Sequence, residues 1–230
     1  MRERYGVDAP GVFALLGSLA LLCAAGAAVA GVLLDGVVAA VVVGFLVVWA
    51  AVLGAQTAWG VVGSLRGKRR VWRRLLDGLR LRGDERVLEV GPGTGPVLVE
   101  VARRVPAGRA VGVDVWRRGD QSGNSRSALL ANAAAAGVDD RVVVLDADMR
   151  RLPFADSGFD VALASLAVHN LPAADRPTAL RELLRVLVPG GRLVILDFQG
   201  TEAYARELRA AGATDVRRSE RHWSMHPPVR

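Results

Sequence analysis

The chain has 230 residues, of which 51% are hydrophobic and 23% charged, and its formal net charge is +7. The one cysteine, Cys23, lies in an apolar run, which excludes a disulfide framework, a zinc–thiolate cluster and a thiol nucleophile in the soluble part. Charge is almost absent between Arg4 and Gly63 and mixed in sign afterwards, so we predict a membrane anchor over residues 1–65 and a soluble domain over residues 66–230.

Two apolar segments, residues 12–34 and 37–63, make up the predicted anchor. Each exceeds the roughly 20 residues that a helix needs to cross a bilayer, and only Asp35 and Gly36 separate them, which predicts a tight antiparallel hairpin. Positive charge flanks the outer ends of the hairpin. The positive-inside rule then places both ends, and the soluble domain, on the cytoplasmic side of the cell membrane.

The first segment also allows a second interpretation. A basic start, an apolar run and "AVA" before Gly31 imitate a cleaved signal peptide. A mature chain that crossed once through residues 37–63 would still deliver the soluble domain to the cytoplasm.

An arginine-rich helix is predicted over residues 66–82, directly after the anchor. Basic residues beside an apolar span favour anionic lipid head groups at about 1 kcal/mol per charge, with nucleic acid as the alternative. The basic residues are Arg66, Lys68, Arg69, Arg70, Arg73 and Arg74. One side of the helix is apolar, and we expect it to pack on the edge of a sheet, the alternative being a helix in the membrane interface. That side comprises Val71, Trp72, Leu75, Leu76 and Leu79.

Short apolar runs alternate with helical stretches in the soluble domain, which predicts an α/β fold with a mostly parallel sheet and helices on both faces. The predicted strands are residues 86–90, 110–115, 141–145, 159–165 and 192–198. The predicted helices between them are residues 96–105, 125–137 and 176–187. One further helix and one strand are expected after residue 198, and consecutive prolines near the end indicate that the last strand of the sheet is short or missing.

A glycine-rich turn, "GPGTG", follows the first predicted strand. Its Gly91, Gly93 and Gly95 would let the backbone approach a ligand closely. Asp114 ends the second strand, where a carboxylate can accept hydrogen bonds from ribose hydroxyls. A dinucleotide fold would also fit these residues, although the usual G-x-G-x-x-G form is missing. Asp148 follows the third strand and is placed to accept from an adenine amine.

Four segments together resemble the class I S-adenosylmethionine-dependent methyltransferases: "LEVGPGTG", "GVDV", "DADMRRLPFADSGFDVALAS" and "LRELLRVLVPGGRLVILDF". The resemblance covers about residues 86–198. It implies a Rossmann-like fold and methyl transfer from S-adenosyl-L-methionine. It also implies that Glu89 and the glycines border the methionine portion, Asp114 the ribose, and Asp148 and Met149 the adenine. The predicted cofactor-binding residues are Glu89, Gly91, Gly93, Gly95, Asp114, Val115, Asp148, Met149 and Ser165.

Methyl transfer is an in-line displacement from an activated donor, so the protein mainly aligns the acceptor with the methyl group. Ser165, His169 and Asn170 are expected to reach the pocket edge. His169 could remove a proton from the acceptor, with a positioning role as the alternative, and Asn170 is a second catalytic candidate. Asp197 would line the acceptor side or brace a loop. The spacing of carboxylates and histidines suits no metal site.

The polar segment over residues 116–125 is interpreted either as a contact with substrate or cofactor or as a helix cap through Asn124 or Ser125. The region after residue 198 is too short for a long acceptor lid. An open pocket held against a bilayer predicts a lipophilic acceptor, such as a quinone precursor, a polyprenyl compound or a lipid head group. The alternatives are a non-catalytic membrane scaffold, a nucleic-acid methyltransferase and a nicotinamide oxidoreductase. The sequence does not determine the oligomeric state.

Overall fold

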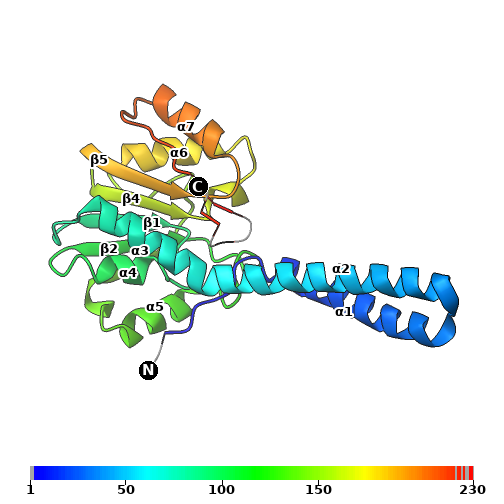
Figure 1. Cartoon of the computed structure of the whole chain (residues 1–230). Coiled ribbons are helices and arrows are strands. Elements are labelled where there is room, and N and C mark those ends of the chain that lie inside the picture. The colour runs from blue at the N-terminus through cyan, green and yellow to red at the C-terminus, as the bar shows by residue number, and fades with distance from the viewer. Residues whose placement is uncertain (1–2, 221, 224, 226–227, 230) are drawn as a thin grey trace.

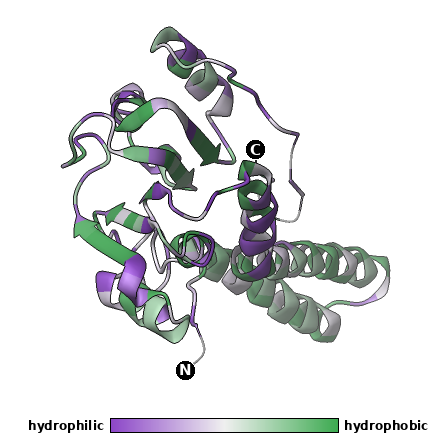
Figure 2. Cartoon of the chain, turned by 90° about the vertical axis from the view of Figure 1, so that its left-hand side faces the viewer, coloured by the Kyte–Doolittle hydropathy of each residue, from purple (hydrophilic) through white to green (hydrophobic). Residues whose placement is uncertain are grey.

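Two long apolar helices form a hairpin that projects from an α/β domain (Figure 1). The computed structural model describes residues 3–220, 222–223, 225 and 228–229. Helix α1 spans Pro10–Leu33 and begins with a proline, which is favourable in the first turn because no intrahelical N–H bond is lost there. Helix α2 spans Gly36–Val62. Both helices are apolar along their length (Figure 2), and by length and composition both could cross a membrane.

The hairpin continues into the domain without a break in the helical backbone. A short π-helical segment, Gly63–Gly67, joins α2 to α3, Lys68–Leu79. The predicted helix over residues 66–82 is therefore the end of one long helix rather than a separate element. Its apolar side is buried in the domain core, where Trp72 is 0% exposed.

Five parallel strands form the sheet, in the order β3-β2-β1-β4-β5. The strands are β1 (Arg86–Val90), β2 (Arg109–Asp114), β3 (Val142–Asp146), β4 (Phe159–Ser165) and β5 (Leu187–Leu196). The first four match the predicted strands to within one residue at each end, whereas β5 begins five residues earlier than predicted. The order reverses at β1, so the crevice beyond the carboxyl ends of β1 and β4 is where an open α/β sheet binds ligands.

Helices cover both faces of the sheet, as predicted. One face packs against α3, α4 (Leu98–Ala102) and α5 (Arg126–Ala135), and the other against α6 (Arg176–Arg185) and α7 (Thr201–Ala210). The expected position of α3 at the sheet edge is wrong. Val71, Trp72 and Leu76 share a core with Val87 of β1 and Leu163 of β4, because the apolar side of α3 is wide enough to cover a face.

The strand expected after α7 is also wrong for the described residues. Residues 213–220 form no strand, and only an isolated antiparallel bridge joins His222 to Val229. Polar and charged residues dominate residues 214–220, which leaves little apolar surface to pair with β5. The sheet consequently ends at β5 in the part of the chain that the structure describes.

Candidate functional site

A pocket lies beyond the carboxyl ends of β1, β2 and β4, at the point where the strand order reverses. It gathers residues from the glycine turn, the loop after β2, the loop after β3 and the end of β4. Of the predicted cofactor-binding residues, those that line it are Glu89, Gly91, Gly93, Asp114, Val115, Asp148, Met149 and Ser165. The loop geometry therefore brings nearly all of the predicted set together.

The glycine turn has a backbone that only glycine adopts easily. Gly91, Gly93 and Gly95 all have positive φ, at 67°, 57° and 83°. A Cβ on Gly91 would lie 2.6 Å from Cβ of Ala167, and a Cβ on Gly93 would lie 2.5 Å from Oε1 of Gln121. Gly95 instead packs on Leu129 and does not line the pocket, so its role is to shape the turn.

Glu89 is a buried carboxyl group that lines the pocket. It is 1% exposed, and its Oε2 atom has no hydrogen-bond partner among the described residues. Burial raises the pKa of Glu89 to about 8, with the charge of Lys68 acting in the opposite direction and that of Asp114 in the same direction. This carboxyl group can therefore gain or lose a proton near neutral pH and lacks a protein donor for one oxygen.

Asp114 ends β2, and the protein backbone holds its carboxylate in place. Its Oδ2 accepts a hydrogen bond from the Gly93 N–H at 3.0 Å, and its Oδ1 accepts one from the Trp116 N–H at 2.7 Å. Burial raises the pKa of Asp114, and these backbone bonds oppose the shift. The second lone pairs of both oxygens stay available to a ligand that donates two hydrogen bonds from adjacent hydroxyls.

The loop over residues 116–125 both caps α5 and lines the pocket, through different residues. Ser125 caps α5, because its hydroxyl accepts a hydrogen bond from the Ala128 N–H at 3.2 Å. Other residues of the loop line the pocket: Arg117, Asp120, Gln121 and Asn124. Trp116 does not line the pocket; its indole N–H donates to Asp146 at 2.7 Å.

The loop after β3 brings Asp148 and Met149 to the pocket. Arg150 holds Asp148 through its guanidinium, at 2.6 Å between Nη2 and Oδ2, and also contacts Asp175 at 2.6 Å. The pKa of Asp148 is lowered, mainly by the hydrogen bond from Arg150. The carboxylate is thus ionised and fixed in orientation beside the pocket.

His169 differs from its prediction, because it does not line the pocket. Its neighbour Asn170 does, in the 3-10 turn Val168–Asn170 after β4, as does Ser165. Nδ1 of His169 lies 2.8 Å from Oδ1 of Asp197, which is 1% exposed. Asp197 also accepts from the backbone N–H groups of His169 and Phe198, so it braces the turn against the end of β5.

Two further pocket residues come from the segments that flank the apolar hairpin. Asp8 precedes α1 and Lys68 begins α3, and both line the pocket beside Glu89. Lys68 was predicted to meet lipid head groups with its basic neighbours, but it is only 4% exposed. That prediction is wrong for Lys68, whereas Arg66, Arg70, Arg73 and Arg74 are exposed.

The domain around this pocket is similar to known proteins. Residues 88–195 match the family described as "Methyltransferase domain". The chain is 38% identical over 133 residues to a ubiquinone/menaquinone biosynthesis C-methyltransferase of Dinoroseobacter shibae, covering 57% of this chain and 50% of that protein. It is 36% identical over 149 residues to a 27-O-demethylrifamycin SV methyltransferase of Amycolatopsis mediterranei, covering 62% and 52%. The chain spans about half the length of these curated relatives.

Solved structures share the fold. The [4+2]-cyclase SpnF has a TM-score of 0.51 and 29% identity, over 63% of this chain and 57% of that one. A SAM-dependent methyltransferase from Aquifex aeolicus has a TM-score of 0.50 and 21% identity, over 65% and 81%. Residues 88–195 thus resemble a methyltransferase domain in sequence, and the five-stranded sheet has the Rossmann-like fold that the sequence predicted.

The pocket residues fit S-adenosylmethionine. The glycine turn leaves no space for side chains where a ligand must approach, Asp114 presents both oxygens at the strand end, and Glu89 keeps one buried oxygen for a donor. The predicted cofactor thus has a matching group for its sugar and its amino-acid portion.

Proposed function

We propose that this chain is a membrane-anchored S-adenosylmethionine-dependent methyltransferase, with its catalytic domain on the cytoplasmic side and a lipophilic small molecule as acceptor. The length and apolar composition of α1 and α2 support the anchor. The proposal of sidedness follows from the basic residues outside the hairpin and the single carboxylate, Asp35, in its turn. Exposed Arg66, Arg70 and Arg74 would contact anionic lipid heads.

The position of the pocket at the foot of the hairpin is the observation that carries this proposal. Asp8 lies two residues before α1, and Lys68 directly follows the helical segment that ends the hairpin, yet both line the same pocket as the glycine turn. A hairpin that crossed a bilayer would therefore hold the pocket near its surface. An acceptor dissolved in the bilayer would then have a short path to the donor.

The names of two relatives support this class of acceptor. One is named as a C-methyltransferase of ubiquinone and menaquinone biosynthesis, and the other as a methyltransferase of 27-O-demethylrifamycin SV. A membrane-soluble compound that loses a proton when its carbon or oxygen is methylated combines both names with the apolar hairpin.

Such an acceptor needs a group that removes a proton, and we propose His169 for this role. The bound donor supplies an electrophilic methyl group on a sulfonium. Asp197 would keep Nδ1 of His169 protonated through their 2.8 Å contact, which leaves Nε2 to accept the acceptor's proton. His169 lies close to Asp120, which lines the pocket, although His169 does not line the pocket itself. Asn170 would orient the acceptor from the pocket wall.

The experiment that tests the function supplies donor carrying a labelled methyl group to the purified full chain together with bacterial membrane extract. We expect the label in a lipophilic product that mass spectrometry identifies, and its loss in a variant with Asp114→Ala. Label that enters only nucleic acid, or only water-soluble molecules, would overturn the proposed acceptor class.

A second candidate function rests on the likeness to the [4+2]-cyclase. A fold of this class does not fix the reaction, and the chain could bind the donor without transferring its methyl group. Such a protein would bind S-adenosylhomocysteine but transfer no labelled methyl group to any acceptor. A non-catalytic membrane scaffold would give the same result.

A further inference from the structure

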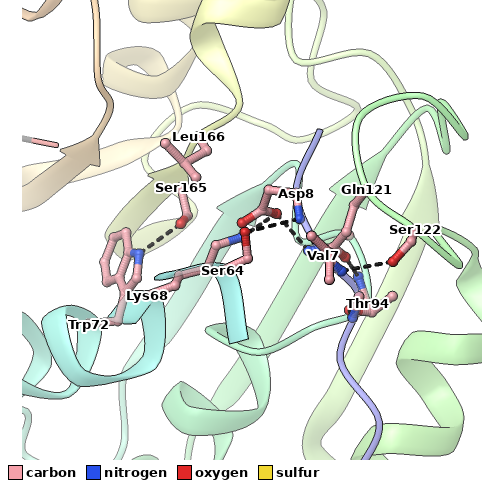
Figure 3. A network of polar contacts seen from close by, with 12 residues as sticks. Val7, Asp8, Ser64, Lys68, Trp72, Thr94, Gln121, Ser122, Ser165 and Leu166 are labelled. Atoms are coloured by element: carbon pink, nitrogen blue, oxygen red, sulfur yellow. Dashed lines mark hydrogen bonds and ion pairs between the residues drawn. The ribbon is translucent and has the colours of Figure 1, made fainter. Parts of the chain in front are cut away.

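The segment before the hairpin lies on the methyltransferase domain and reaches the pocket. The N–H of Val7 donates to Oγ of Ser122 at 2.8 Å (Figure 3). The N–H of the preceding residue, Gly6, donates to Oγ1 of Thr94 at 3.1 Å. The N–H of Ser122 in turn donates to the carbonyl of Val7 at 2.9 Å. Residues of the glycine turn and of the loop after β2 therefore hold this segment.

Asp8 and Lys68 join the two ends of the hairpin at the pocket. Nζ of Lys68 lies 2.6 Å from Oδ1 of Asp8, and that oxygen also accepts from Nε2 of Gln121 at 2.9 Å (Figure 3). Lys68 is almost fully buried, at 4% exposure. Asp8 accounts for one of the three N–H donors of the buried Lys68 ammonium, so the other donors can face a second anionic group in the pocket.

The same end of the pocket holds two carboxylate oxygens without a partner. Oδ2 of Asp8 and Oε2 of Glu89 are buried and accept no hydrogen bond from any described residue. Both residues line the pocket together with Lys68. One buried cation beside two unsatisfied acceptors is complementary to a zwitterion, which carries a carboxylate and an ammonium group on one carbon.

We propose that Lys68, positioned by Asp8, binds the α-carboxylate of the methionine portion of the donor. This inference rests on the cofactor being S-adenosylmethionine. Both residues lie outside the matched residues 88–195: Asp8 precedes the apolar hairpin in the sequence, and Lys68 follows it. The hairpin is then part of the donor site as well as an anchor, and its two ends form one wall of that site.

The test compares two ligands that differ by one carboxylate. S-adenosylhomocysteine carries it, and decarboxylated S-adenosylhomocysteine keeps the nucleoside and the amine. We expect Lys68→Met to weaken S-adenosylhomocysteine about tenfold or more in calorimetry on the full chain in detergent, because a charge-assisted hydrogen bond is lost. The affinity for the decarboxylated ligand should change less than twofold.

A matched control removes a positive charge from the exposed side of the same helix. Arg70→Met should leave both affinities unchanged. Asp8→Asn is the second variant and should weaken S-adenosylhomocysteine selectively, because Lys68 loses its charged partner. If Lys68→Met weakened both ligands equally, or neither, the assignment would be overturned in favour of a structural role. Failure of the unmodified chain to bind either ligand would instead refute the cofactor on which the inference rests.

Discussion

Glu89→Gln gives the sharpest test of how the pocket recognises its donor. The carboxyl group has a pKa raised to about 8 by burial, and its Oε2 lacks a protein partner. If the ionised form binds the ammonium group of the donor, the observed dissociation constant is the intrinsic one divided by the ionised fraction. That fraction is about 1% at pH 6 and about half at pH 8, so affinity should rise about fifty-fold over this interval.

Calorimetry with S-adenosylhomocysteine between pH 6 and pH 8 measures this dependence. Binding at pH 6 should release about one proton, which appears as an enthalpy that changes with the ionisation enthalpy of the buffer. Glu89→Gln should abolish the proton release and most of the pH dependence. It should also weaken binding at pH 8 by about tenfold or more, because a charge-assisted hydrogen bond is lost.

5′-Methylthioadenosine serves as the control ligand, since it keeps the nucleoside but has no amino-acid portion. The affinity for this ligand should not depend on the protonation of Glu89. Any dependence on pH that it shows would therefore come from another group, such as Asp114 near the ribose. His169→Ala should leave the dependence of affinity on pH intact. An affinity for S-adenosylhomocysteine that is flat between pH 6 and pH 8 would refute the reasoning, as would an equal slope in Glu89→Gln.

Four further substitutions probe other parts of the domain. Asp114→Ala should weaken donor binding by at least about 1 kcal/mol in calorimetry, and an unchanged affinity would contradict its assignment to the ribose. His169→Ala and Asp197→Asn should both lower kcat and alter its pH profile while donor affinity stays the same; normal turnover in both variants would leave the pair a purely structural role. Trp72→Phe removes a buried hydrogen bond of 2.7 Å to Ser165. It should lower the free energy of unfolding by about 1–3 kcal/mol in denaturant titrations, and an unshifted unfolding midpoint would contradict this expectation.

Most of the sheet could be predicted from the sequence because it is parallel and buried on both faces. Strands of this kind are continuous apolar runs, and "RVLEV" and "FDVALAS" have the same bounds in the structure as in the sequence pattern. The five-residue difference at β5 arises because "LVPGG" contains a proline and two glycines, which are unfavourable in strands but are accommodated at a bulge opposite Phe159 and Val161.

Those residues of the donor pocket that lie at or just after strand ends could be predicted from the sequence. The carboxyl ends of parallel strands meet at one edge of the sheet, which brings together Glu89, Gly91, Gly93 and Asp114. The position of His169 could not be predicted in this way. Its imidazole contacts Asp197, a residue distant in sequence at the end of β5.

For Lys68, the charge pattern predicts an exposed side chain, whereas the helical period predicts a buried one. The charge pattern groups Lys68 with the neighbouring arginines. Its spacing of three, four and seven residues to Val71, Trp72 and Leu75 instead places it on the apolar side of the helix. The exposed arginines occupy the opposite side. The period could therefore have identified Lys68 as a buried cation. No local pattern could have identified its partner Asp8, because an entire apolar hairpin separates the two in the sequence and only the packing of residues 3–9 on the domain brings them together.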